Sequence, residues 1–210
     1  TGCDDVTVRL AYVTAAEAKD SNVARSLRTN AEDYKTGMGC DLLIYTDEGQ
    51  SQKLASNATV MAWLEQNAAR YGFVVRYPAD KAEKTGVAEY TEYYRYVGVP
   101  HATYMKANNL CLEEYLVLLR TYTSKDRLSI QALDGKTYEV YYCAVAGDGS
   151  ISCPTNYNYT VSGTNEGGVV VTIDRSVVAN QPIYTDNAQS ATEPATVPES
   201  VSASESQTTP

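Results

Sequence analysis

The chain is poor in histidine, phenylalanine and tryptophan, with one of each among 210 residues. The single histidine, His101, excludes sites built on two or three histidines, such as H-E-x-x-H zinc proteases and paired-histidine iron sites. No apolar run reaches the roughly 18 residues that a membrane-spanning helix needs. Acidic residues outnumber basic ones by 26 to 17, and the formal charge is −9. This balance argues against a general nucleic-acid binder, because phosphate contacts need clustered Lys and Arg.

Tyrosine is the residue in excess, with 18 copies, and five cysteines are present. The odd number leaves at least one cysteine unpaired within the chain. Cys143 and Cys153 flank residues 146–150 (AGDGS), where a short loop would place the two residues opposite each other in a hairpin. We therefore predict a Cys143–Cys153 disulfide, which is typical of exported proteins. The alternative is a pair of half-buried thiols.

The first residues, Thr1-Gly2-Cys3, look like the end of a lipoprotein signal, in which Cys3 would carry the lipid. The alternative is an accidental boundary of an excised fragment. On the first interpretation we expect a protein outside a bacterium or at its cell surface, held there by a lipid anchor.

Residues 1–124 are predicted to form one α+β domain. From Asp5 to Thr14, apolar residues alternate at Val6, Val8, Leu10 and Tyr12, which predicts a strand. Further strands are predicted at residues 37–45, 73–77 and 93–97, and helices at 57–71, 100–108 and 112–122. The first of these helices would be capped by Ser56 or Asn57, would bury a face that includes Val60, Leu64 and Tyr71, and would stop at Gly72.

The chain changes character after Ser124. Residues 125–175 contain short β-prone segments at 127–132, 138–145, 151–153, 157–161 and 169–173. Gly-containing turns separate these segments, which predicts a small antiparallel β module. Residues 176–210 are rich in Ser, Thr, Ala, Pro and Glu, and we expect a disordered tail or linker because such a composition buries too little apolar surface to fold.

Two features allow both a catalytic and a structural interpretation. His101 could serve as a base for a Cys or Ser nucleophile, but no nucleophile lies near it in the sequence, so we expect an exposed surface histidine. Glu113 and Glu114 begin a predicted helix, where carboxylates complement the helix dipole. We expect that role for them and not a catalytic carboxylate pair.

Four segments recur in the order and spacing of a known family. They are YKTGMGCD from Tyr34 to Asp41, WLEQNAARYGFVVRYP from Trp63 to Pro78, TGVAEYTEYYRYVG from Thr85 to Gly98, and LEEYL from Leu112 to Leu116. Together they resemble the VanY-type D-alanyl-D-alanine carboxypeptidases, zinc enzymes that trim bacterial cell-wall peptides. The resemblance covers about residues 5–120 and implies a small, mostly antiparallel sheet with flanking helices, as in the D,D-carboxypeptidase and hedgehog-like folds. The β module looks like one that follows this domain in some relatives.

The resemblance also shows that the catalytic residues of the family are replaced here. The first family motif reads S-x-H-x-x-G-x-x-x-D, with its His and Asp on zinc, and these two positions hold Tyr34 and Asp41. The second motif reads E-P-W-H-Y-R-Y, with Glu as general base and His as the third zinc ligand. Tyr90 stands at the general-base position and Tyr93 at the histidine position.

The surrounding motif positions are partly kept. Glu92 stands where the family has Trp, whereas Tyr94-Arg95-Tyr96 match the family motif. The family also has a substrate-binding Y-R-S motif, and the resemblance aligns it with Tyr12-Val13-Thr14. With this alignment the arginine of the motif is lost as well.

These replacements predict that the chain binds no metal and no other cofactor, although the resemblance implies zinc in the active relatives. A hydrolytic zinc needs three protein ligands and an open position for water. Tyrosine, with an ordinary pKa of about 10, is a poor ligand at neutral pH. Cys40 neighbours Asp41 but should face the opposite side of its strand.

Three functions follow from this resemblance. The leading hypothesis is an exported, inactive relative that binds a cell-wall peptide or a surface protein through the former cleft. The candidate contacts are Tyr34, Asp41, Tyr90, Glu92, Tyr93 and Arg95. The first alternative is an active metallopeptidase with an atypical site on Asp41 and Glu89 or Glu92. The second alternative is a structural surface domain whose cleft is closed by the tyrosines. An open cleft would favour the first two, and a filled cleft the last.

Overall fold

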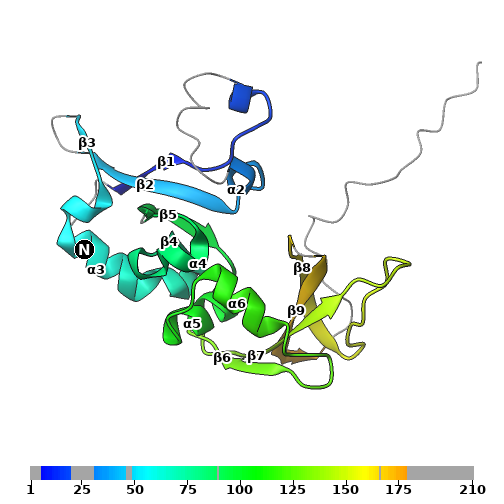
Figure 1. Cartoon of the computed structure of the whole chain (residues 1–210). Helices are drawn as coiled ribbons and strands as arrows, with labels where there is room; N and C mark the ends of the chain where they lie inside the picture. Colours follow the sequence, from blue (N-terminus) through cyan, green and yellow to red (C-terminus); the bar gives the residue numbers. More distant parts are fainter. Residues whose placement is uncertain (1–5, 20–30, 46–48, 89, 166, 179–210) are drawn as a thin grey trace, which may run out of the picture.

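Two antiparallel sheets and the helices around them make up the described part of the chain (Figure 1). The computed structural model describes residues 6–19, 31–45, 49–88, 90–165 and 167–178. Cys3, Glu89 and the predicted tail beyond residue 178 lie outside these ranges. Within them, no helix is long and apolar enough to cross a membrane. The predicted α+β fold class is confirmed.

The first sheet has the strand order β1-β2-β5-β4, with β3 paired to the end of β2. All of its pairings are antiparallel. Its strands are β1 (Val6–Leu10), β2 (Gly39–Tyr45), β3 (Ser51–Gln52), β4 (Phe73–Tyr77) and β5 (Tyr90–Tyr96). The short strand β3 was not predicted, and β5 begins three residues before its predicted start at Tyr93.

Helices connect these strands and follow the sheet. They are α2 (Ala31–Lys35), α3 (Ala58–Asn67), α4 (Ala82–Thr85), α5 (Val99–Ala107) and α6 (Leu112–Leu119), with 3-10 turns η1 (Glu17–Lys19), η2 (Leu54–Ser56), η3 (Ala68–Tyr71) and η4 (Ala79–Lys81). Pro100 lies in the first turn of α5, as predicted, where its missing N–H breaks no helical hydrogen bond.

Helix α3 covers one face of the first sheet. Asn57 caps it, and its Oδ1 accepts hydrogen bonds from the backbone N–H groups of Thr59 and Val60 at 3.1 Å. Val60 is buried in a cluster with residues of β2 and β5, among them Ile44 and Tyr94. The predicted buried position of Tyr71 is wrong. Tyr71 is 62% exposed, because the chain tightens into η3 after α3 and turns this ring outward.

The second sheet has the order β6-β7-β9-β8 and is also antiparallel. Its strands are β6 (Leu128–Gln131), β7 (Thr137–Ala144), β8 (Tyr157–Gly163) and β9 (Gly168–Val178). Residues 151–153, predicted as a strand, lie instead in the loop between β7 and β8. Strand β9 continues three residues beyond the predicted end of the β module at residue 175.

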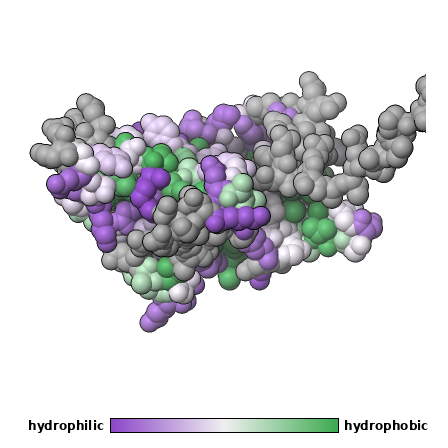
Figure 2. Space-filling model, turned by 90° about the horizontal axis from the view of Figure 1, so that it is seen from above, coloured by the Kyte–Doolittle hydropathy of each residue, from purple (hydrophilic) through white to green (hydrophobic). Residues whose placement is uncertain are grey.

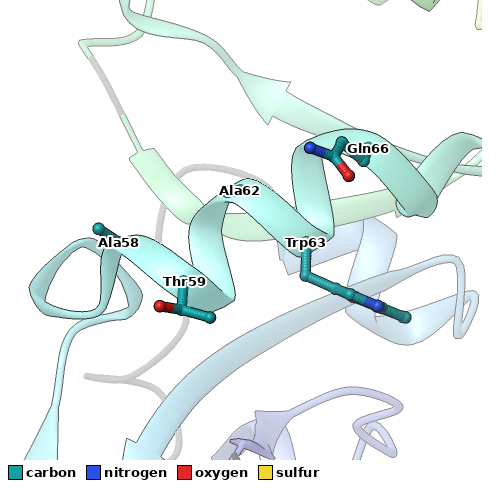
Figure 3. Close-up of a pocket in the computed structure, with 5 residues that line it drawn as sticks. All are labelled: Ala58, Thr59, Ala62, Trp63 and Gln66. Atoms are coloured by element: carbon teal, nitrogen blue, oxygen red, sulfur yellow. The ribbon is translucent and has the colours of Figure 1, made fainter. Parts of the chain in front are cut away.

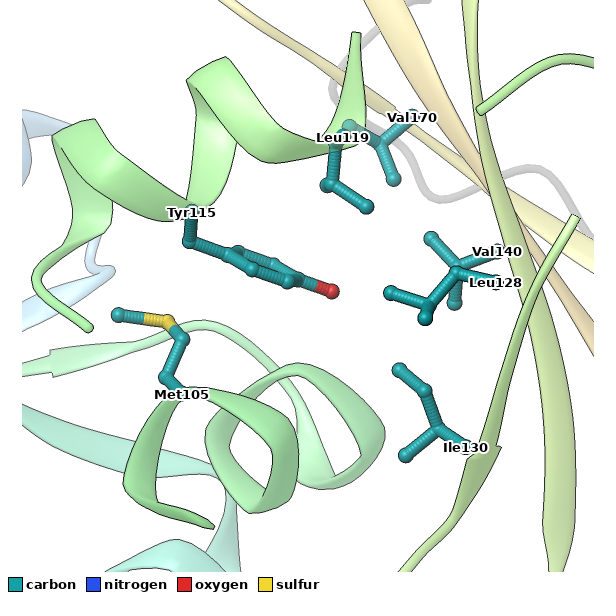
Figure 4. Packing of buried hydrophobic residues seen from close by; sticks show 7 residues of the cluster. All are labelled: Met105, Tyr115, Leu119, Leu128, Ile130, Val140 and Val170. Carbon is teal, nitrogen blue, oxygen red and sulfur yellow. The ribbon is translucent and has the colours of Figure 1, made fainter. Parts of the chain in front are cut away.

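A single hydrophobic core joins α5 and α6 to the second sheet. Met105, Tyr115 and Leu119 come from the two helices, and Leu128, Ile130, Val140 and Val170 come from the sheet (Figure 4). These side chains are at most 7% exposed. The core therefore crosses the boundary that was predicted between residues 124 and 125.

Cys143 and Cys153 are free thiols, so the predicted disulfide is absent. Cys143 pairs with Val169 of β9, while Cys153 lies in a loop outside the ladder. The two-stranded hairpin on which the prediction depended is not continued past the turn at Ala146 and Ser150. Both thiols pack partly buried beside Tyr141 and Tyr159, as the alternative interpretation expected.

Candidate functional site

Asp41 of β2 lies at the centre of the residues that the sequence singled out, and it is 0% exposed. The Tyr34 hydroxyl donates to Asp41 Oδ1 at 2.8 Å, and the Tyr90 hydroxyl donates to Oδ2 at 2.8 Å. Arg9 forms an ion pair with the same Oδ2 and donates to the Tyr90 hydroxyl at 3.0 Å. Donors from within the chain therefore satisfy both oxygens of this buried carboxylate, as interior polar groups require.

Four tyrosine rings fill the space beside Asp41, and we call Tyr34, Tyr77, Tyr90 and Tyr93 the tyrosine cluster. The Tyr93 ring centroid lies 5.3 Å from that of Tyr34, 5.8 Å from that of Tyr77 and 5.9 Å from that of Tyr90. These separations are those of rings in direct contact. The four residues are 1–8% exposed and form the middle of a hydrophobic core.

Tyr93 does not bond to Asp41. Its hydroxyl donates to Asp33 Oδ2 at 2.9 Å, and Asp33 also forms an ion pair with Arg95. The structure therefore divides the predicted contacts into two neighbouring carboxylate centres, one at Asp41 and one at Asp33. Asp33 was not predicted, because it lies in a polar segment without a periodic pattern.

A bulge in β5 brings Tyr90 and Tyr93 together. Val75 pairs with Tyr94 and Tyr77 pairs with Tyr90, so β5 uses four residues where β4 uses two. In a regular strand, residues 90 and 93 would face opposite sides. The pairing is irregular at this point, and Tyr90 lies in the same buried cluster as Tyr93.

A second bulge aims Arg9 at Asp41. Val8 pairs with Leu42 and Leu10 with Asp41, so Arg9 is an extra residue in β1. Three of the four alternating apolar residues of this segment are exposed, since Val6 is 36%, Val8 55% and Tyr12 63% exposed. Arg9 lies between two of the alternating apolar residues, and no local signal in the sequence marks the bulge at this residue.

Gly39 makes room for Tyr93. A Cβ at residue 39 would lie 2.1 Å from the Tyr93 hydroxyl oxygen and 2.7 Å from the ring carbon that carries it. Only glycine fits at this position while Tyr93 keeps its place. The large ring in β5 and the small residue in β2 are therefore matched across the sheet.

The cluster is electrically unsuited to hold a metal ion. Burial raises the pKa values of Tyr34 and Tyr93 well above the ordinary value, and for Tyr34 the Asp41 charge raises it further. Both hydroxyls therefore stay protonated and donate hydrogen bonds. No group of three His, Cys, Asp or Glu side chains that could bind a metal occurs among the described residues. The residues present do not fit the zinc that the resemblance implies for active relatives.

The other predicted positions lie around the cluster. Glu92 and Arg95 are half-buried on β5, and Glu89 is not among the described residues. Val13, at the position of the lost substrate arginine, is 3% exposed in the same core, and its N–H donates to the Tyr34 carbonyl at 3.0 Å. Cys40 faces the α3 side of the sheet, as the strand alternation predicted. Peptide binding by Tyr34, Asp41 and their neighbours stays a prediction.

His101 is not the exposed surface residue that the sequence predicted. Its Nδ1 lies 2.8 Å from the Tyr115 hydroxyl, and its Nε2 lies 2.9 Å from Thr172 Oγ1. It therefore connects α5 to α6 and to β9. Burial lowers the pKa of His101 to about 4, so the ring is neutral at neutral pH.

Glu113 and Glu114 have the structural role that was expected. Glu113 forms an ion pair with Arg76 of β4, and Glu114 forms one with Lys81. Glu114 also accepts a hydrogen bond from the backbone N–H of Cys111, which completes a capping box at the start of α6.

A shallow surface hollow of about 460 Å³ lies along α3, and it includes none of the tyrosine cluster. Ala58, Thr59, Ala62, Trp63 and Gln66 line it (Figure 3). Trp63 is 40% exposed and stacks on Tyr71. On the face shown in Figure 2, apolar groups lie in separate small areas among hydrophilic side chains.

Comparison with solved structures defines the class of domain. A D,D-dipeptidase, VanXYg in complex with a D-Ala-D-Ala phosphinate analog, has a TM-score of 0.66 to this chain and is 28% identical. The likeness covers 81% of this chain and 74% of that one, which is more than residues 1–124 can supply, so it extends into the second sheet. The fold is therefore that of the D,D-peptidases.

Sequence comparison relates part of the chain to one family. Residues 11–99 match the family model described as VanY, D-alanyl-D-alanine carboxypeptidase. A D-alanyl-D-alanine carboxypeptidase of Enterococcus faecium is 39% identical over 127 residues, which are 60% of this chain and 41% of that protein. One of Enterococcus faecalis is 53% identical over 57 residues, 27% of this chain and 21% of that protein. The chain is therefore similar to the VanY-type family over residues 11–99, and its matches span about two fifths or less of the length of these relatives.

Proposed function

We propose that this chain is a non-catalytic member of the VanY-type family, in which the former active site serves as a structural core. The observation that carries the proposal is the burial of the centre: Asp41 is 0% exposed, and Tyr34 and Tyr93 are each 1% exposed. A metallopeptidase needs a metal with an open position for water and a path for its substrate. Closed packing around a fully bonded Asp41 supports neither.

The filled centre also helps to choose between the two non-catalytic functions, which are peptide recognition at the former cleft and a purely structural role. A wall peptide that entered between Tyr34 and Tyr93 would have to separate rings that are already in contact. It would also have to break the hydrogen bond from Tyr34 to Asp41. Because opening a packed core leaves cavities and unpaired polar groups, the geometry favours a structural surface domain over peptide recognition at this centre. We propose that this role is performed at the bacterial cell surface, and the only basis for this location is the similarity to the VanY-type family.

A D-alanine release assay tests the proposal. The protein is incubated with zinc and a peptide ending in D-Ala-D-Ala, and free D-alanine is measured beside an active family member. We expect release at the level of a heat-inactivated sample. Release that disappears in Asp41→Asn while the variant keeps its fold would refute a non-catalytic role.

A thermal-shift titration separates the two non-catalytic functions. A ligand that binds only the folded state raises the melting temperature by mass action. With the same peptide at millimolar concentration we expect no shift. A dose-dependent rise that is lost in Tyr34→Phe would instead establish peptide recognition at the former cleft.

A further inference from the structure

The buried negative charge of Asp41 is paired with a positive charge, that of Arg9. A buried carboxylate is unstable unless it is paired and hydrogen-bonded. Two of its donors, the hydroxyls of Tyr34 and Tyr90, are neutral. Among the described residues, Arg9 supplies the positive charge that touches Asp41, through Nη2 on Oδ2.

Arg9 reaches this position from the edge of the sheet. Its side chain is 31% exposed whereas that of Asp41 is 0% exposed, so the guanidinium closes the solvent side of the carboxylate. The bulge at Arg9 directs the side chain to Asp41. The same Nη2 also donates a hydrogen bond to the Tyr90 hydroxyl at 3.0 Å, which holds this nitrogen between Asp41 and Tyr90.

The electrostatics of Arg9 agree with this geometry. Burial alone lowers the pKa of Arg9, but the charge of Asp41 and the contacts with Tyr90 outweigh this effect and raise it. The guanidinium is therefore a permanent cation. A divalent metal on Oδ2 would have to displace it, since both would need the same lone pairs and their positive charges repel.

We propose that Arg9 is a built-in cation that occupies the place of a metal ion at Asp41 and prevents metal binding there. This proposal rests on the proposed function, because it explains how a centre without zinc keeps its aspartate. The proposal goes beyond that function because it assigns the exclusion of the metal ion to Arg9, which lies outside the family's zinc motifs. Replacing the tyrosines by histidines will therefore not be sufficient to create a metal site.

The test compares zinc affinity in two variants. Tyr34→His/Tyr93→His places imidazole donors at the two positions where the family has histidine, and a second variant adds Arg9→Met. Isothermal titration with zinc should show affinity at least about tenfold higher when Arg9 is removed. Arg127→Met in the same histidine background is the matched control. Arg127 pairs with Glu139 in the second sheet, and its removal should leave zinc affinity unchanged.

Equal zinc affinity with and without Arg9 would overturn the proposal, and so would an equal gain from Arg127→Met. Failure of the proposed function is a separate result, because it would appear as zinc-dependent D-alanine release by the unmodified chain.

A second measurement does not depend on the histidine variants folding. In a thermal double-mutant cycle, Arg9→Met and Asp41→Asn should each lower the melting temperature, and the double variant should lose less than the sum of the two. Additive losses would show that the two residues are not a charge pair, and would overturn the proposal.

Discussion

At the scale of single residues, the buried carboxylate of Asp41 depends on donors that can be removed one at a time. Tyr34→Phe keeps the ring and removes only the hydroxyl that donates to Oδ1 at 2.8 Å. We expect a loss of about 2 kcal/mol in the free energy of unfolding, because a buried acceptor is left without its partner. Urea denaturation measures this loss.

Tyr12→Phe is the control for this prediction, since Tyr12 is 63% exposed. It should change stability by less than about 0.5 kcal/mol. Equal effects of the two variants would mean that the Tyr34 hydroxyl contributes nothing at the centre.

Gly39→Ala tests the match between the two facing strands. The new methyl group would meet the Tyr93 hydroxyl at 2.1 Å, and three neighbouring rings keep Tyr93 from moving aside. We expect a loss of about 2 kcal/mol from overpacking, measured by thermal or urea denaturation.

Gly147→Ala is the matched control, because a Cβ there meets no atom within 4 Å. The prediction fails if Gly39→Ala is as stable as Gly147→Ala.

At the scale of elements, His101 ties α5 to α6 and to β9, which predicts an acid-sensitive contact. The groups that face it are Tyr115 on α6 and Thr172 on β9. Its pKa is lowered to about 4 in the folded protein and is about 6.5 in the unfolded chain. As the pH falls from about 6.5 to about 4, the unfolded chain takes up a proton that the folded protein does not, so stability falls over this window.

Between about pH 7 and about pH 5, this single group should lower the free energy of unfolding by at most about 2 kcal/mol. Urea denaturation of the wild type and His101→Gln at both pH values isolates the effect, because all other groups are shared. The variant should lose less stability on acidification. Parallel losses would contradict the buried, neutral histidine.

The helices and strands also differ in how well the sequence predicts them. The Asn57 cap, the stop at Gly72, β4 and the start of α5 depend on local patterns, and the structure confirms them, although α3 itself ends at Asn67 and the turn η3 continues to Gly72. The bulges at Arg9 and between Tyr90 and Tyr94 depend on pairing with distant strands, so no local pattern marks them. Tyr34, Asp41, Tyr90 and Tyr93 could be selected from family motifs, whereas Arg9 and Asp33 required the fold.

At the scale of the whole molecule, the helices of the first part and the second sheet share one core. Ending the chain at residue 124 would expose Met105, Tyr115 and Leu119, which are at most 2% exposed in the intact protein. We expect fragment 1–124 to aggregate or to lose cooperative unfolding, because apolar burial is the main stabilising contribution.

Fragment 1–178, which keeps both sheets, is the control and should melt cooperatively. Thermal unfolding of the two fragments, followed by circular dichroism, gives the melting temperature and the cooperativity of each. A soluble fragment 1–124 with the melting temperature of the longer fragment would show that the two parts fold independently.

We propose that the former catalytic centre of this chain is a closed core around Asp41 that holds no metal. The most direct test of this proposal is the zinc content of the unmodified protein after equilibration with excess zinc and desalting, measured by plasma mass spectrometry. We expect far less than one zinc per chain, and the same value for Asp41→Asn. One zinc per chain in the wild type, lost in Asp41→Asn, would contradict the proposal.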